Sequence, residues 1–214
     1  MTVITGDCRN KKMVLRLEAL GWGRMMVAGV GPSMPFKPYH CEPYGVDNGA
    51  YAFHLKGKRW PETKFRKLID RVLQLDLVPY LCVLPDIVGG GEESLETSLA
   101  WYDRLPRDLP WYLAVQDGMT PTLIEPYLDN YPLVGLFLGG TNGFKGSALA
   151  WSLLAHKRGM KFHYGRAGTL KKVRYAKFVK ADSIDSALPL WTRERFNNFV
   201  EYVGGRDLQH DWLS

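Results

Sequence analysis

Hydrophobic segments of strand length recur along the chain, and polar or glycine residues close most of them. Six segments carry such a signature at their end: Gly45–Asp47, Leu81–Asp86, Leu113–Gln116, Leu136–Gly140, Lys161–His163 and Ser183–Asp185. The run Met25–Val30 predicts one more strand before these six, and Val3–Ile4 is a candidate for an eighth. Short apolar runs of this kind are typical of strands that are buried on both faces.

Segments with helical spacing of apolar residues separate these strands. The first of them places Phe65, Ile69 and Val72 on one helix face. Another begins at Thr120–Pro121, an N-cap residue followed by a first-turn proline. The expected helices cover residues 61–73, 92–101, 120–128, 147–156, 169–179 and 192–203.

Strands that alternate with helices indicate an α/β fold with a parallel sheet, joined by right-handed crossovers. Such a sheet either closes into a barrel or stays open and doubly wound. A chain of 214 residues, 46% of them hydrophobic, is enough for one buried core and short for two domains. We therefore expect residues 1–214 to form a single catalytic domain, a compact (β/α)8 TIM-type barrel. An open or incomplete barrel is the alternative.

The polar signatures gain meaning from this fold, because the carboxyl ends of barrel strands meet on the face that carries active sites. Asp47, Asp86 and Asp185 would then share one pocket with the amide of Gln116 and with His163. A lone aspartate at a strand end more often caps a helix than catalyses a reaction. Several polar groups at several strand ends favour an enzyme.

Two of the carboxylates suit displacement at an anomeric carbon, where one acts as nucleophile and the other handles protons. Ser183 and Asp185 lie on the same face of their strand by alternation, and a strand-end carboxylate is fixed well enough to attack carbon. Gly49 follows Asp47, and a glycine there lets the backbone approach a ligand closely. Asp86 and Gln116 have the acceptors and donors to read the edge of a base.

Charge and cysteine content indicate which partners and which cellular compartment to expect. The net charge is +6, with basic clusters at residues 56–67, 157–161 and 171–180. This charge is compatible with a polyanionic partner, although a solvated helix face accounts for such clusters equally well. Cys8, Cys41 and Cys82 are odd in number and scattered, and no metal-ligand spacing occurs. The sequence has no signal peptide pattern and no membrane-length apolar run, so an intracellular protein without metal or cofactor is expected.

Six motifs in order resemble the series found in the guanine transglycosylase superfamily, which exchanges guanine for a 7-deazaguanine base in nucleic acid. They are Asp47–Tyr51, Pro85–Gly89, Val115–Gly118, Leu138–Thr141, His163–Arg166 and Asp182–Ser186. The match runs from about residue 45 to residue 191. It is most similar to the DNA-acting branch of phages and bacterial genomic islands. A cytoplasmic location, or the host cytoplasm for a phage-encoded chain, is expected.

The resemblance implies a role for each matching position. Asp185 would be the nucleophile that forms a covalent glycosyl-enzyme intermediate, and Asp47 the general acid and base. Asp86 and Gln116 would bind the base edge, and Gly139, Gly140 and Thr141 would complete its recognition.

Stacking and phosphate contacts are implied at further positions. Tyr51 and Tyr164 would clamp the purine from either side; for each, a rim or core aromatic is the alternative. Arg166 would contact a backbone phosphate, and His163 belongs to the same His-x-Gly-Arg signature, where a satisfied strand-end histidine is the alternative. Lys145 is another phosphate candidate, with an ordinary surface lysine as its rival.

The chain departs from the tRNA-acting branch in having no CxCxxC…H zinc site. We therefore expect DNA as the macromolecular substrate, a free preQ0-like base as co-substrate, and no zinc. Because the chain is short for the family, a separate protein that presents the DNA is a candidate partner. The alternatives are a nucleoside or glycoside hydrolase of the same barrel type and a non-catalytic nucleic-acid-binding protein.

Overall fold

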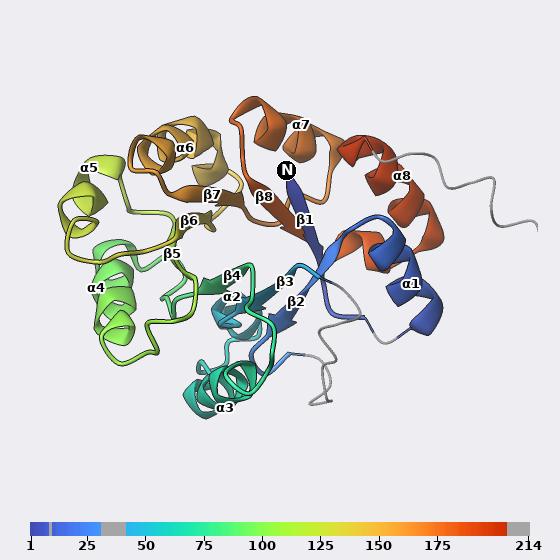
Figure 1. The fold of residues 1–214 in the computed structure, drawn as a ribbon. Coiled ribbons are helices and arrows are strands. Elements are labelled where there is room, and N and C mark those ends of the chain that lie inside the picture. Colours follow the sequence, from blue (N-terminus) through green and yellow to red (C-terminus); the bar gives the residue numbers. More distant parts are fainter. Residues whose placement is uncertain (9, 31–41, 205–214) are drawn as a thin grey trace, which may run out of the picture.

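A computed structural model describes residues 1–8, 10–30 and 42–204, which form a closed barrel of eight parallel strands (Figure 1). Each strand pairs with the next along the chain, and β8 returns to pair with β1. The strands are β1 (Thr2–Thr5), β2 (Gly23–Val27), β3 (Tyr44–Asp47), β4 (Leu81–Val83), β5 (Trp111–Val115), β6 (Gly135–Leu138), β7 (Lys161–Tyr164) and β8 (Ser183–Ser186). The predicted (β/α)8 barrel is confirmed, and the incomplete and doubly wound alternatives are wrong.

The helices form the outer layer of the barrel (Figure 1). They are α1 (Lys11–Ala19), α2 (Ala50–His54), α3 (Glu62–Val72), α4 (Gly91–Tyr102), α5 (Pro121–Ile124), α6 (Ala148–Lys157), α7 (Leu170–Phe178) and α8 (Arg193–Val203). Short 3-10 turns occur at η2 (Glu125–Tyr127), η3 (Phe144–Ser147) and η4 (Leu188–Leu190). No helix in the described ranges is long and apolar enough to cross a membrane.

Side-chain caps explain where several of the predicted helices begin. Thr120, Thr169 and Thr192 each accept a hydrogen bond from the backbone N–H three residues later, which satisfies one donor of the first turn. The helix predicted for residues 120–128 is shorter than expected. It ends at Ile124 and continues as a 3-10 turn, because Pro126 has no N–H to donate to the preceding turn.

Two helices were not predicted from the sequence. In α1 only Leu17 is fully buried, so its apolar stripe is too thin to stand out. The other, α2, has five residues and begins after Gly49, whose φ of 79° lies in the left-handed region. Of the two, α2 begins three residues after the end of β3 and contains Tyr51.

Alternation along each strand divides the core into two clusters. One packs between strands and helices and includes Val46, Phe162, Tyr164 and Ile184. The other fills the inside of the barrel with six buried residues, Ile4, Met25, Leu81, Val83, Tyr112 and Ala114. Asp47 is level with Val27 on β2, and Asp185 is level with Ile4 on β1. The inner apolar cluster therefore reaches the level of the two carboxylates, through Ile4 beside Asp185 and Val27 packed against the cluster beside Asp47.

Candidate active site

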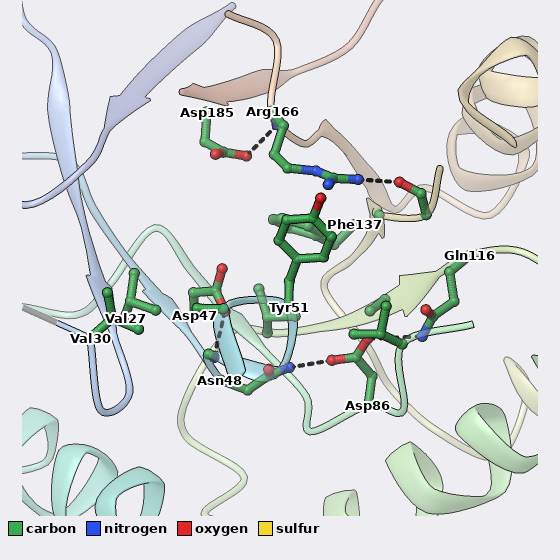
Figure 2. Close-up of a pocket in the computed structure, with 17 residues that line it drawn as sticks. Val27, Val30, Asp47, Asn48, Tyr51, Asp86, Gln116, Phe137, Arg166 and Asp185 are labelled. Carbon is green, nitrogen blue, oxygen red and sulfur yellow. Dashed lines mark hydrogen bonds between the residues drawn. The ribbon is translucent and has the colours of Figure 1, made fainter. Parts of the chain in front are cut away.

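A cavity of about 220 Å³ opens at the carboxyl ends of the strands (Figure 2). Its volume is below the roughly 300–1,000 Å³ of pockets for drug-sized ligands, which suits a small planar ligand. The apolar residues of its lining include Val27, Val83, Ala114 and Phe137, which lie on four different strands. The polar part includes eight of the predicted site residues: Asp47, Tyr51, Asp86, Gln116, Gly139, Gly140, Arg166 and Asp185.

Asp185, on β8, is held from two sides. Its Oδ1 accepts hydrogen bonds from Nε2 of His163 and from the backbone N–H of Arg166, each over 3.0 Å. Burial acts to raise the pKa of Asp185, but these hydrogen bonds and the charges of His163 and Lys145 outweigh it, so the pKa is lowered. The carboxylate is therefore ionised at neutral pH, as a nucleophile requires.

His163 lies inside the barrel and is fully buried. Its Nδ1 is 2.8 Å from Oγ of Ser183, and its ring stacks on Phe137 with centroids 4.6 Å apart. With a proton on Nε2, the imidazole donates to Asp185, while Ser183 satisfies the other ring nitrogen. The pairing confirms that Ser183 and Asp185 share one face, and it makes His163 a partner of the carboxylate rather than an exposed contact for a phosphate.

Asp47, at the end of β3, has the opposite electrostatic environment. Burial raises its pKa to about 7, and the charges of Asp185 and Asp86 add to this effect, against a hydrogen bond from the backbone N–H of Gly49. Figure 2 shows the carboxylates of Asp47 and Asp185 directed into the same cavity. Two carboxylates whose environments separate their pKa values are suited to different roles in one reaction.

Asp86 follows β4 and is fixed by two amides. Its Oδ1 accepts from Nδ2 of Asn48 and its Oδ2 from Nε2 of Gln116, each over 2.8 Å. The side-chain oxygen of Gln116, Oε1, in turn accepts a hydrogen bond from the backbone N–H of Gly89. Burial raises the pKa of Asp86 to about 6 in spite of both hydrogen bonds. The amides orient the carboxyl group, which keeps further lone pairs for a ligand.

Tyr51 and Arg166 form a pair at the edge of the cavity (Figure 2). The guanidinium of Arg166 lies 4.0 Å from the centroid of the Tyr51 ring, and it donates to the carbonyl of Gly140. The backbone of Arg166 has a φ of 55°, which is unusual for a residue other than glycine. This turn allows one residue to donate its N–H to Asp185 while its side chain reaches the opposite rim.

One expectation for the stacking residues is wrong. Tyr164 is 2% exposed and points away from the barrel interior, because it alternates with the inward His163; it packs edge-on against Tyr175. It therefore cannot form the second face of a base clamp in this cavity. Gly49 lines the cavity, and its backbone also lies close to the carbonyl oxygen of Ala28, which a Cβ on Gly49 would meet at 2.3 Å.

Thr141 and Lys145 also lie outside the cavity. The backbone N–H and hydroxyl of Thr141 both bind Asp117, at 2.7 and 2.6 Å. Lys145 is 2% exposed, and its ammonium donates to the carbonyls of Leu138 and Gly165 at the ends of β6 and β7. The alternative of an ordinary surface lysine is wrong for this residue.

The structure also adds residues that the sequence reading missed. Asn48 orients Asp86 and binds the Leu84 carbonyl, and its position next to Asp47 in the motif was the signal available. Phe137 gave no such signal, because a phenylalanine within an apolar strand reads as core. Among the described residues, no group of three or more His, Cys, Asp or Glu side chains is placed to hold a metal ion. Cys8 and Cys82 are free thiols, and Cys41 lies outside the described residues.

Comparison with known proteins adds information on the fold. No family model and no curated protein matches the chain. Among solved structures, the chain is similar to a monomeric dihydrodipicolinate synthase variant, with a TM-score of 0.57 and 14% sequence identity. The match covers 94% of this chain and 76% of the other. At this identity the likeness shows the barrel fold alone.

Proposed function

We propose that this protein is an enzyme that exchanges guanine in DNA for a 7-deazaguanine base through a covalent aspartyl-glycosyl intermediate. One observation carries the proposal: Asp47 and Asp185 line one cavity, and the pKa of Asp47 is raised to about 7 while that of Asp185 is lowered. The motif order supports the substrate class, and the net charge of +6 is compatible with DNA.

In the first half of the reaction, a carboxylate oxygen of Asp185 attacks C1′ of the target deoxyguanosine. The bond between C1′ and N9 of guanine breaks, and its electron pair goes to the base. The protonated carboxyl group of Asp47 delivers a proton to the departing base. The products are free guanine, ionised Asp47 and an ester between Asp185 and the sugar.

In the second half of the reaction, Asp47 acts as a base. The carboxylate of Asp47 takes the N9 proton of the incoming 7-deazaguanine, and N9 attacks C1′. The ester bond to Asp185 breaks and its carboxylate is restored. A pKa of about 7 for Asp47 suits a group that must give and then take a proton near neutral pH.

Recognition of the base falls to the opposite side of the cavity in this proposal. Asp86 would accept hydrogen bonds from ring N–H or amino groups, held in place by Asn48 and Gln116. Val83, Ala114 and Phe137 would contact the apolar faces and edges of the ring. The target nucleotide must leave the stack to reach this cavity, at a cost of a few kcal/mol for paired DNA and less for single strands.

Incubation of DNA with labelled guanine tests the proposal. The wild-type protein is expected to incorporate label, and denaturing gels are expected to show a covalent DNA adduct. Asp185→Asn should abolish both. Asp103→Asn is the control and should abolish neither, because Asp103 is an exposed residue that follows α4 and forms an ion pair with Arg107. An adduct that survives Asp185→Asn would contradict the assignment of the nucleophile.

The same assay separates the alternatives. Abasic DNA without incorporated label would identify a hydrolase, in which water takes the place of the incoming base. Salt-dependent DNA binding with neither product, and with no effect of Asp47→Ala or Asp185→Ala in any turnover assay, would identify a non-catalytic binding protein.

A further inference from the structure

A second cavity, of about 470 Å³, lies beside the first, on the other side of the segment Tyr164–Arg166. Tyr164 lines the second cavity and Arg166 the first. The walls come from the region of η3 and from the first turns of α7. They include Lys145, Lys171, Lys172, Thr169 and Tyr175, and none of the described residues that line the cavity is an aspartate or glutamate.

The positive charge of this cavity is not neutralised by carboxylates. Among the residues that the structure describes, none of its three lysines forms an ion pair. Lys172 donates instead to the backbone carbonyl of Arg166 over 3.5 Å. Burial lowers the pKa of Lys145 to about 7, and the charges of Arg166 and Lys172 lower it further against the attraction of Asp185. An anion in the cavity would relieve this repulsion.

Hydrogen-bond donors accompany the charge. Two carbonyls accept from the ammonium of Lys145, and its Nζ lies 4.8 Å from the centroid of the Tyr164 ring, another residue that lines this cavity. The first turn of α7, capped by Thr169, adds the positive end of a helix of nine residues. Lysines from two different elements and a helix N-terminus thus line one cavity that is open to solvent.

We infer that this second cavity binds a phosphate group. The identity of the ligand rests on the proposed function: it is a backbone phosphate of the DNA strand, next to the target nucleotide. Arg166 connects the two sites, because its backbone carbonyl accepts from Lys172 while its backbone N–H donates to Asp185. A phosphate held by the lysines would position the sugar of the neighbouring nucleotide at the mouth of the active site.

Binding of a single-stranded oligodeoxynucleotide, measured without turnover over a range of salt concentrations, tests this inference. The double change Lys171→Ala and Lys172→Ala is expected to reduce the slope of log affinity against log salt by about 0.7, the value for one phosphate contact on a single strand. Lys180→Ala is the matched control, since Lys180 is an exposed lysine beyond the far end of α7, before β8. An unchanged slope for the double variant, or an equal loss in the control, would overturn the inference. If the alanine double variant fails to fold, Lys171→Gln with Lys172→Gln replaces it.

Neutral methylphosphonate linkages, placed one at a time along the oligonucleotide, identify the source of the phosphate. One linkage should weaken binding to the wild-type protein by about 10-fold, or about 1.4 kcal/mol, and have no effect on the double variant. If no linkage matters, the DNA assignment is overturned. Phosphorus NMR of inorganic phosphate then decides whether the cavity takes a free phosphate: broadening that the double variant abolishes supports the site, and its absence overturns it. These measurements need no base exchange, so their outcome is separate from that of the turnover assay.

Discussion

His163 donates a hydrogen bond from Nε2 to Oδ1 of Asp185 over 3.0 Å, although its ring is fully buried inside the barrel. The two residues lie on neighbouring strands, β7 and β8, and Ser183 holds the other ring nitrogen. The histidine thereby lowers the pKa of a buried carboxyl group that desolvation alone would raise. This relationship gives His163 a positioning role in the proposed reaction.

His163→Phe is expected to shift the acidic limb of the pH–rate profile to higher pH. Phenylalanine keeps a flat ring against Phe137 but removes the donor, so the pKa of Asp185 rises and ionisation requires a higher pH. A hydrogen bond to a charged group contributes about 1.5–3 kcal/mol, which corresponds to a shift of about 1–2 pH units. The rate of adduct formation, followed from about pH 4 to about pH 9, measures it. A profile that keeps its midpoint while losing amplitude would mean that the histidine acts on packing alone.

Asp47→Asn is expected to slow adduct formation by about 10²–10⁴-fold, because the departing guanine loses its proton donor. In the wild-type protein, the same step should decline above about pH 7, since Asp47 then becomes ionised. The variant should lack this basic limb. Single-turnover experiments with excess enzyme isolate the step from base insertion. A basic limb that persists in the variant would assign the acid to another group.

The raised pKa values of Asp47 and Asp86 also predict how stability depends on pH. Both groups ionise near pH 4 in the unfolded chain, but at about 7 and about 6 in the folded protein. Between these values the folded state binds more protons than the unfolded state, so the contribution of both groups to stability falls as pH rises. Asp47→Asn should therefore gain stability relative to the wild type by roughly 2–4 kcal/mol between about pH 4 and about pH 8. Urea unfolding at both pH values measures this, and a difference that does not change with pH would contradict the raised pKa.

Gly49→Ala tests the close contact beneath the Asp47 motif. The left-handed backbone of Gly49 disfavours alanine by about 1–2 kcal/mol, and its Cβ would also meet the Ala28 carbonyl oxygen at 2.3 Å. Gly21→Ala is the control, because Gly21 has a similar φ of 64° and no atom within 4 Å of an added Cβ. Thermal or urea unfolding should show a larger loss at position 49 than at position 21. Equal losses would mean that the backbone moves to accommodate the new side chain.

Strands and helices could be predicted wherever the apolar pattern of a single segment was clear. The apolar runs ending in Asp47, Gln116 and Asp185 are strands that carry their polar groups to one end of the barrel. The threonine cap predicted at Thr120 marked the start of α5. Elements with little apolar contrast were missed: α1 buries one residue fully, and α2 is a single short turn after Gly49.

Residue roles were harder to predict than elements, because they depend on which way a side chain points. Tyr164 and His163 are neighbours on β7, and alternation sends the histidine into the barrel and the tyrosine to the helices. Lys145 lies in a glycine-rich stretch that reads as exposed, yet it is buried against the carbonyls of Leu138 and Gly165. On a strand such as β7, a one-residue difference in register moves a side chain to the other face of the sheet.

The order of the strands and of most helices, and the presence of three aspartates at strand ends, could be predicted from the amino-acid sequence, since they follow from periodicity and local chemistry. The difference in pKa between these aspartates depends on the folded barrel. Hydrogen-bond partners such as His163 and Asp185, or Asp86 and Gln116, are 22 and 30 residues apart along the chain. Closure of the barrel brings them together and removes water from around them, and both effects act through space rather than along the sequence.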